Sequence, residues 1–124
     1  MIEFLPAPPH VLAFRIEGTL TAEDYDRLET EVDARLARPG KVGVYCDMTG
    51  FADITAAAAG KDLRYSFGKI ALWGRFPRNA LVTDKQWLRT LVRTLDPLIP
   101  GVEARAFDPS EKDAALAWVA ALKP

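Results

Sequence analysis

Apolar residues recur along the chain with two different periods, and this pattern predicts a sheet covered by helices. Short runs rich in β-branched and aromatic residues predict strands at 2–5, 11–17, 41–48, 79–83 and 102–107. Apolar positions spaced by three and four predict helices between most of these runs. Because strands and helices alternate after an opening hairpin, we expect an α/β sandwich in the order ββαβαβαβα, with a mixed, mostly parallel sheet of about five strands and four helices.

Capping residues mark where the expected helices begin. Thr21 precedes the first helix, the second runs from Thr55 to about Leu72, and the fourth follows Asp108. The sequence at 83–86 fits a capping box before the third helix. The stripes expected to face the core are Tyr25, Leu28, Val32 and Leu36; Leu63, Phe67 and Ile70; Trp87, Leu88, Leu91, Val92 and Leu95; and Ala115, Trp118, Val119 and Leu122.

Length and composition predict one globular domain that spans residues 1–124. The chain is 49% apolar and has a net charge of −1, so its overall charge gives no indication of nucleic-acid binding. One cysteine and the lack of a secretion-like segment favour a cytoplasmic protein. No apolar run approaches the roughly 20 residues that cross a bilayer, so no integral membrane segment is expected.

Charge is distributed unevenly along the sequence. Residues 56–95 contain eight Lys or Arg and two acids, whereas residues 1–55 contain five basic and ten acidic residues. A basic middle third could attract an anionic ligand, a membrane surface or an acidic partner, or it could be the solvated surface of two helices. Six acids between 23 and 33 could complement the basic helices across a homodimer, which predicts association that is sensitive to salt.

Side chains for nucleophilic or metal chemistry are scarce. The only histidine, His10, lies in a proline-rich turn, and neither Ser66 nor Ser110 lies at a strand-to-helix elbow. Cys46 lies inside an apolar strand, where a thiol is usually unreactive. One histidine and one cysteine cannot form a soft metal site, so we expect no metal and no cofactor.

Three acids fall near the carboxyl ends of predicted strands, where ligand crevices form in parallel sheets. Asp47, Asp84 and Asp108 could hold Mg²⁺ there, with Lys85 facing a phosphate, which would give a phosphoryl-transfer or metal-dependent enzyme. Helix capping explains Asp108, and a place in the first turn of a helix explains Asp84. Asp47 alone has no local explanation.

Several segments, in this order and spacing, resemble the SpoIIAA-like family of the STAS superfamily. The resemblance implies a compact α/β fold that is shared with bacterial anti-sigma-factor antagonists and is similar to CRAL–TRIO lipid-transfer domains. Members of the family mostly have no assigned activity, and the leading expectation is a regulatory module that is not an enzyme. The segments that carry it are Phe14–Gly18 with Leu20–Tyr25, Val44–Met48, Lys61–Leu63, Val82–Trp87 and Ala115–Trp118.

The resemblance also points to a recognition edge. Asp47-Met48-Thr49-Gly50 matches the opening of the pattern that precedes the phosphorylated serine of the antagonists, with Gly50 expected in a turn. Thr55 stands one residue short of that phosphoacceptor position. The acid before it and the Ser-Gly after it are absent, since Thr55 is followed by two alanines. Thr55 is therefore the candidate phosphoacceptor, beside the edge formed by Asp47, Thr49 and Gly50.

These features lead to two non-enzymatic hypotheses and the enzymatic one above. The first is a protein-interaction module of the antagonist type, which binds a protein partner or itself. The second is a site for a small apolar or anionic lipid-like ligand between the 55–72 and 85–95 helices. Aromatic residues could line this site, or form core, and a basic residue could meet a head group. The candidate ligand or partner surface is Arg64, Trp73, Lys85, Trp87 and Arg89, and the aromatic candidates are Tyr65, Phe67, Trp73, Phe76 and Trp87.

Overall fold

A computed structural model describes residues 1–98 and 101–122 of the chain, without the side chains of Phe67 and Ile70. Its strands form one sheet in the order β1-β2-β3-β4-β5. The β1 strand is antiparallel to β2, and each later pair is parallel, which confirms the predicted hairpin and parallel sheet. The strands are β1 (Ile2–Phe4), β2 (Val11–Leu20), β3 (Gly43–Ile54), β4 (Arg78–Val82) and β5 (Glu103–Phe107).

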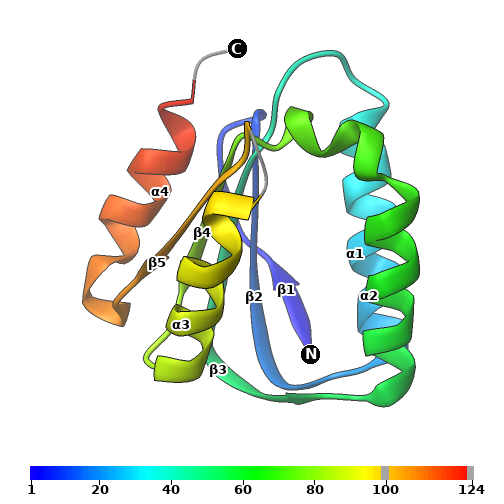
Figure 1. The fold of residues 1–124 in the computed structure, drawn as a ribbon, viewed down its shortest axis with the longest axis vertical. Coiled ribbons are helices and arrows are strands. Elements are labelled where there is room, and N and C mark those ends of the chain that lie inside the picture. Colours follow the sequence, from blue (N-terminus) through cyan, green and yellow to red (C-terminus); the bar gives the residue numbers. More distant parts are fainter. Residues whose placement is uncertain (99–100, 123–124) are drawn as a thin grey trace.

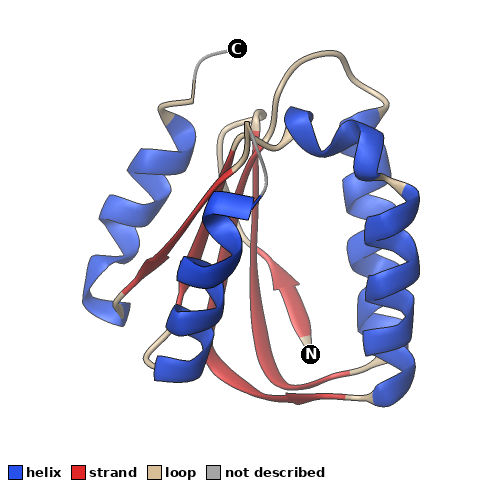
Figure 2. Ribbon diagram, in the orientation of Figure 1, coloured by secondary structure: helices blue, strands red, loops and turns tan. Residues whose placement is uncertain are grey.

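The helices cover both faces of this sheet (Figures 1 and 2). The α4 helix packs on one face and the other three helices lie over the opposite face. This arrangement confirms the predicted single α/β domain with four helices. The helices are α1 (Ala22–Leu36), α2 (Ala56–Gly68), α3 (Gln86–Leu95) and α4 (Lys112–Ala120), and short 3₁₀ helices are η1 (Ile70–Arg75), η2 (Asp96–Leu98) and η3 (Pro109–Glu111).

Tight packing characterises the face under α4. Ala115 and Val119 of α4 and Val82 of β4 have no exposed surface. Gly43 lies directly under α4, where an added Cβ would be 2.8 Å from Val119 Cγ1 and from the Val119 carbonyl oxygen. Only a residue without a side chain permits this approach between α4 and β3.

The β3 strand is longer than the sequence predicts. It continues past Met48 to Ile54, so Gly50 lies in a strand and the expected turn there is wrong. The reason is that β2 also continues, to Leu20, and keeps pairing with β3 through two irregularities of register. The recognition edge therefore lies along the extended end of β3.

Two local predictions about the helices also fail. Leu63, predicted to face the core, is 60% exposed, and the other two members of its stripe have side chains outside the described set. The capping box at 83–86 does not form, because Lys85 occupies the N-cap position and makes no side-chain cap. The capping boxes at Thr21 and Asp108 do form.

Candidate functional site

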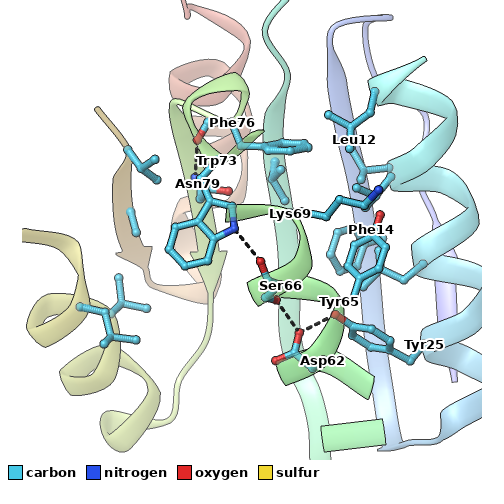
Figure 3. A pocket seen from close by; sticks show the side chains of 18 of the residues that line it. Leu12, Phe14, Tyr25, Asp62, Tyr65, Ser66, Lys69, Trp73, Phe76 and Asn79 are labelled. Carbon is cyan, nitrogen blue, oxygen red and sulfur yellow. Dashed lines mark hydrogen bonds between the residues drawn. The ribbon is translucent and has the colours of Figure 1, made fainter. Parts of the chain in front are cut away.

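A cavity of about 480 Å³ opens between the α1–α2 pair and α3. We call it the interhelical cavity (Figure 3). Its lining is mostly apolar and comes from the sheet and from all three helices on this face. Strand residues in the lining are Leu12, Phe14, Val44, Asn79 and Ala104. The α1 helix gives Tyr25, Leu28, Val32 and Leu36, and the segment from α2 to the residue after η1 gives Asp62, Tyr65, Ser66, Lys69, Trp73 and Phe76. The α3 helix and the segments after it give Leu91, Val92, Leu95, Asp96 and Val102.

Polar contacts hold α1 and α2 together on one side of the interhelical cavity. Tyr25 Oη donates to Asp62 Oδ1 at 2.5 Å, and Tyr65 Oη donates to Asp33 Oδ1 at 2.6 Å. Burial first, and the accepting carboxylate second, raise the pKa of both tyrosines far above the ordinary value. Both phenols are therefore protonated donors at neutral pH. Lys61 adds an ion pair to Asp26, with a distance of 2.7 Å.

The other side of the interhelical cavity is formed by α3, which packs against β5. Leu88 of this helix is buried in the core, whereas Leu91 and Leu95 line the cavity and remain 45% exposed. The α2 helix packs against α1, and α3 packs against β5 at the edge of the sheet. The sheet surface between the two groups of helices is therefore not covered by a helix.

Two aromatic side chains, one in η1 and one just after it, form part of the wall of the interhelical cavity. Trp73 Nε1 donates to the Ser66 carbonyl oxygen at 3.0 Å, which fixes the indole against α2 (Figure 3). Phe76 follows in the chain and also lines the cavity. Arg75 donates to the Leu36 carbonyl oxygen at 2.9 Å, so η1 is anchored to the end of α1. These contacts make the aromatic wall part of the folded framework.

The profile of the SpoIIAA-like family matches residues 11–120 of the sequence. The chain belongs to the SpoIIAA-like family. Its fold is similar to the crystal structure of an uncharacterised DUF3478-family protein from Shewanella loihica PV-4, which has a SpoIIAA-like fold. The TM-score is 0.75 at 24% identity, covering 96% of this chain and 92% of that one.

The fold is also similar to the unphosphorylated form of the anti-sigma-factor antagonist SpoIIAA. That comparison gives a TM-score of 0.66 at 11% identity and covers 98% of this chain and all of that one. None of the curated proteins compared with the chain matches it. The predicted family and STAS-like fold are therefore confirmed.

The recognition edge of this SpoIIAA-like protein is built around a buried carboxylate. Asp47 is 3% exposed; its Oδ1 accepts from Thr49 N at 3.0 Å and from Thr49 Oγ1 at 2.7 Å. Its Oδ2 lies 3.1 Å from Lys112 Nζ of α4. Burial alone would raise the pKa of Asp47, but these hydrogen bonds and the ion pair outweigh it, so its pKa lies below the ordinary carboxyl value. Asp47 thus ties α4 to β3.

The other strand-end acids pair with neighbouring cations. Asp84 Oδ1 lies 3.7 Å from Lys85 Nζ, and Asp108 forms an ion pair with Arg89. Within residues 1–98 and 101–122, no group of three or more His, Cys, Asp or Glu side chains is placed to hold a metal ion.

Two other residues considered for chemistry have structural partners. His10 Nε2 lies 2.8 Å from the Ala120 carbonyl oxygen, so this ring nitrogen must donate, and His10 ties the turn before β2 to the end of α4. Burial, followed by the charge of Asp47, raises the pKa of the Cys46 thiol above its ordinary value. A raised pKa keeps the thiol protonated and poorly nucleophilic.

Thr55 lies at the start of α2. Its Oγ1 accepts from Ala58 N at 3.1 Å, so the hydroxyl caps the helix in the structure. Lys85 Nζ reaches the Thr49 carbonyl oxygen at 3.5 Å, which places the first turn of α3 beside the recognition edge. The candidate phosphoacceptor and the recognition edge thus lie at the same end of the sheet as the start of α3.

Among the predicted ligand-contacting residues, the structure brings only part of the set to the interhelical cavity. Tyr65, Trp73 and Phe76 line it, while Phe67 is outside the described side chains. Trp87 is 57% exposed and is not in the lining, and Leu88 takes the buried position of that turn. Neither Lys85 nor Arg89 is in the lining. Arg64 borders a separate shallow hollow with Glu29, Lys61 and Tyr65.

Opposite charges on the helices meet inside one chain. Lys61 pairs with Asp26, and Lys69 Nζ lies 3.7 Å from Asp33 Oδ1. Part of the charge complementarity that predicts a homodimer is therefore used within one chain, between α1 and the α2 region. In the described part of the chain, no helix is both long enough and apolar enough to span a membrane.

The sequence hypothesis missed two parts of the interhelical cavity. The sequence predicts the stripe of α1 as core, and Tyr25 is indeed buried while Leu28 and Val32 pack against the core. The whole stripe also lines the cavity, which the sequence does not predict. Asn79 was seen only as the first residue of a strand. Its signal was a single amide in the strand pattern NALVT, on the face opposite the buried Ala80.

Proposed function

We propose that this SpoIIAA-like protein is a non-enzymatic binding module that holds a small apolar molecule in the interhelical cavity. The observation that carries the proposal is the cavity of about 480 Å³, with walls of leucine, valine and aromatic side chains. This volume lies in the range of about 300–1,000 Å³ that is usual for small-molecule sites. Such sites are mostly apolar, with a few polar groups that orient the ligand.

The free energy of burying apolar surface favours binding of an apolar ligand in the interhelical cavity. Apolar surface gains about 25 cal/mol per Å² when it is removed from water, and here several large side chains face the cavity. The framework around it is held by hydrogen bonds that involve Tyr25, Tyr65 and Trp73, so a ligand would not have to order the walls. A preorganised site loses less of its binding energy to ordering.

Binding of a neutral fluorescent probe tests this proposal. N-Phenyl-1-naphthylamine emits strongly in apolar surroundings, and we expect one probe to bind per chain with saturable enhancement. Ala104→Phe places a ring in the floor of the cavity and should weaken probe binding at least about tenfold. Ala117→Phe, on the exposed surface of α4, is the matched control and should bind like the wild type.

Two results would contradict the proposal. One is the absence of saturable probe binding to the wild-type protein. The other is equal binding by the wild type and Ala104→Phe, with both chains shown to be folded by circular dichroism. Native mass spectrometry of the purified protein adds an independent observation, because a retained apolar ligand would appear as added mass.

A second candidate function is interaction with a protein partner at the recognition edge. The similarity of the fold to the antagonist SpoIIAA supports it. A further support is that Ile54 is 40% exposed and Trp87 is 57% exposed, although both are large apolar residues. Exposed aromatic residues beside charged ones are typical of interaction surfaces. On this hypothesis Thr55 would be the regulated residue, since phosphate is favourable at a helix N-terminus.

Trp87 offers the sharpest test of this second function. A partner captured by the wild-type protein, then purified and rebound, should bind Trp87→Ala at least about tenfold more weakly. Ala104→Phe should bind that partner normally, because its change lies inside the cavity. A partner that binds both variants equally would contradict this surface.

A further inference from the structure

Most polar side chains that line the interhelical cavity already have partners. Asp62 Oδ1 accepts from the Tyr25 hydroxyl at 2.5 Å and from the Ser66 hydroxyl at 3.4 Å. Asp96 Oδ1 accepts from Ala104 N at 2.6 Å, which provides a hydrogen-bond partner for this backbone amide of the edge strand β5. Lys69 lies beside the carboxylate of Asp33. These groups contribute to the fold and have reduced capacity to bind a ligand.

Asn79 is different, because the nitrogen and the oxygen of its carboxamide have different surroundings. Its Nδ2 donates to the Phe76 carbonyl oxygen at 2.9 Å (Figure 3). It also reaches the Glu103 carbonyl oxygen at 3.5 Å. Both partners are acceptors, so the amide nitrogen must face them and the orientation of the carboxamide is fixed. The Oδ1 atom then faces the other way, and no donor in the described part of the chain bonds to it.

The sheet register places Asn79 on the surface of the sheet that forms the floor of the interhelical cavity. Asn79 lies opposite Val44 on one side and opposite Ala104 on the other, and all three residues line the cavity. The neighbouring Ala80 points to the α4 face. The carboxamide is therefore a single polar group on an apolar floor.

An apolar occupant would displace water from Oδ1 and leave the acceptor without a donor. That loss costs about 1–3 kcal/mol when the group is buried. A ligand that carries its own donor at this end avoids the loss. We propose that the interhelical cavity selects an amphiphile with a neutral hydroxyl at its buried end, and that Asn79 Oδ1 accepts the hydrogen bond from that hydroxyl. This inference rests on the proposed function of the cavity.

Charge around the interhelical cavity favours an alcohol over a fatty-acid anion. The carboxylates of Asp62 and Asp96 both line it, and Asn79 presents an acceptor. Lys69 is the cationic residue in the described lining, and its Nζ lies 3.7 Å from Asp33 Oδ1 and 5.6 Å from the Tyr65 ring centroid. A ligand carboxylate would meet an oxygen at Asn79 and would compete with Asp33 for Lys69.

Competition against N-phenyl-1-naphthylamine by three small ligands tests this selection. We would compare 1-octanol, its isomer heptyl methyl ether, and octanoate at neutral pH. The ether has the formula of the alcohol but no donor. In the wild type we expect the alcohol to bind about tenfold more tightly than either competitor, as for one hydrogen bond in a buried site.

Substitution of Asn79 isolates the role of its oxygen. Asn79→Leu keeps a similar volume and should lower the alcohol-to-ether affinity ratio to about one. Gln86→Leu makes the same kind of change at the exposed start of α3, outside the cavity lining, and should keep the wild-type ratio. The ratio within one variant is independent of how much active protein each preparation contains.

The outcomes separate the two proposals. Equal affinity of the wild type for alcohol and ether, or tighter binding of octanoate, overturns the selection and leaves the cavity as an apolar site. Failure of all three ligands and of the probe to bind overturns both proposals. If Asn79→Leu does not fold, the wild-type affinities of the three ligands still show whether the cavity prefers the alcohol.

Discussion

The two faces of the sheet are packed in different ways, although the same strands form both. Under α4 the surfaces interlock, with Val82 and Val119 fully buried and no room for a side chain at Gly43. On the opposite face, the α1–α2 pair and α3 stand apart over the interhelical cavity. The α4 face is therefore closely packed at Gly43, whereas the opposite face combines a buried core around Leu12 and Phe14 with an open cavity between its helices.

The largest effect is expected at Gly43. Its Cβ in Gly43→Ala would lie 2.8 Å from the Val119 carbonyl oxygen, so α4 would have to shift. We expect a loss of about 3 kcal/mol in the free energy of unfolding, measured with urea. Gly60→Ala in α2 is the control, because nothing lies within 4 Å of the added Cβ and alanine favours helix. Unchanged stability in Gly43→Ala would contradict close packing under α4.

Matched valine substitutions compare the two faces directly. Val82→Ala empties a fully buried position on the α4 face and should cost about 2 kcal/mol. Val44→Ala removes the same atoms from a side chain that borders the interhelical cavity, where fewer contacts are lost, so about 1 kcal/mol or less is expected. Equal losses in urea unfolding would show that the two faces are equally well packed.

Asp47 makes the stability of the α4 face depend on pH. Folding lowers the pKa of Asp47 below the ordinary value of 3.8, so the unfolded state binds its proton more readily. The stabilisation is therefore present above that ordinary value and is lost as the pH falls through the lower, folded-state pKa. Asp47→Asn should cost about 1.5 kcal/mol at neutral pH and flatten the loss of stability in acid. Parallel pH profiles for both proteins would assign that loss to other groups.

The smallest effect is expected on the cavity face, at its surface ion pair. Lys61 and Asp26 are 35% and 55% exposed, so water and salt screen their attraction. Lys61→Met should change the free energy of unfolding by no more than about 0.5 kcal/mol. A loss several times larger would mean that the α1–α2 pair depends on charge more than on its buried tyrosines.

Much of the fold could be predicted because its signals are local. The alternation of strands and helices predicts the parallel sheet, and Thr21 caps α1 as predicted, whereas Asp108 caps the short η3 helix that precedes α4. The sequence-based predictions failed where contacts with residues distant in the sequence determine the local structure. Gly50 lies in a strand because β2 extends alongside it, and Asp47 forms an ion pair with Lys112, which is far away in the sequence.

The position of the interhelical cavity could be predicted, but only part of the set of residues that line it. The hypothesis of a ligand site between the second and third predicted helices led to the interhelical cavity, with Tyr65, Trp73 and Phe76 in its wall. Trp87 and Leu88 are adjacent in an apolar stripe, and periodicity could not tell which one faces inward. The structure buries Leu88. The place of Asn79 in the cavity could not be predicted, because a single amide in a strand gives no periodic signal.

One NMR titration tests the central claim that the cavity face binds an apolar ligand and the α4 face does not. Amide shifts of ¹⁵N-labelled protein would be followed as 1-octanol is added. We predict saturable changes centred on Val44, Leu91 and Ala104, with Ala115 and Val119 of α4 nearly unmoved. Shifts that do not saturate, or that are as large in α4 as in the cavity lining, would contradict the account.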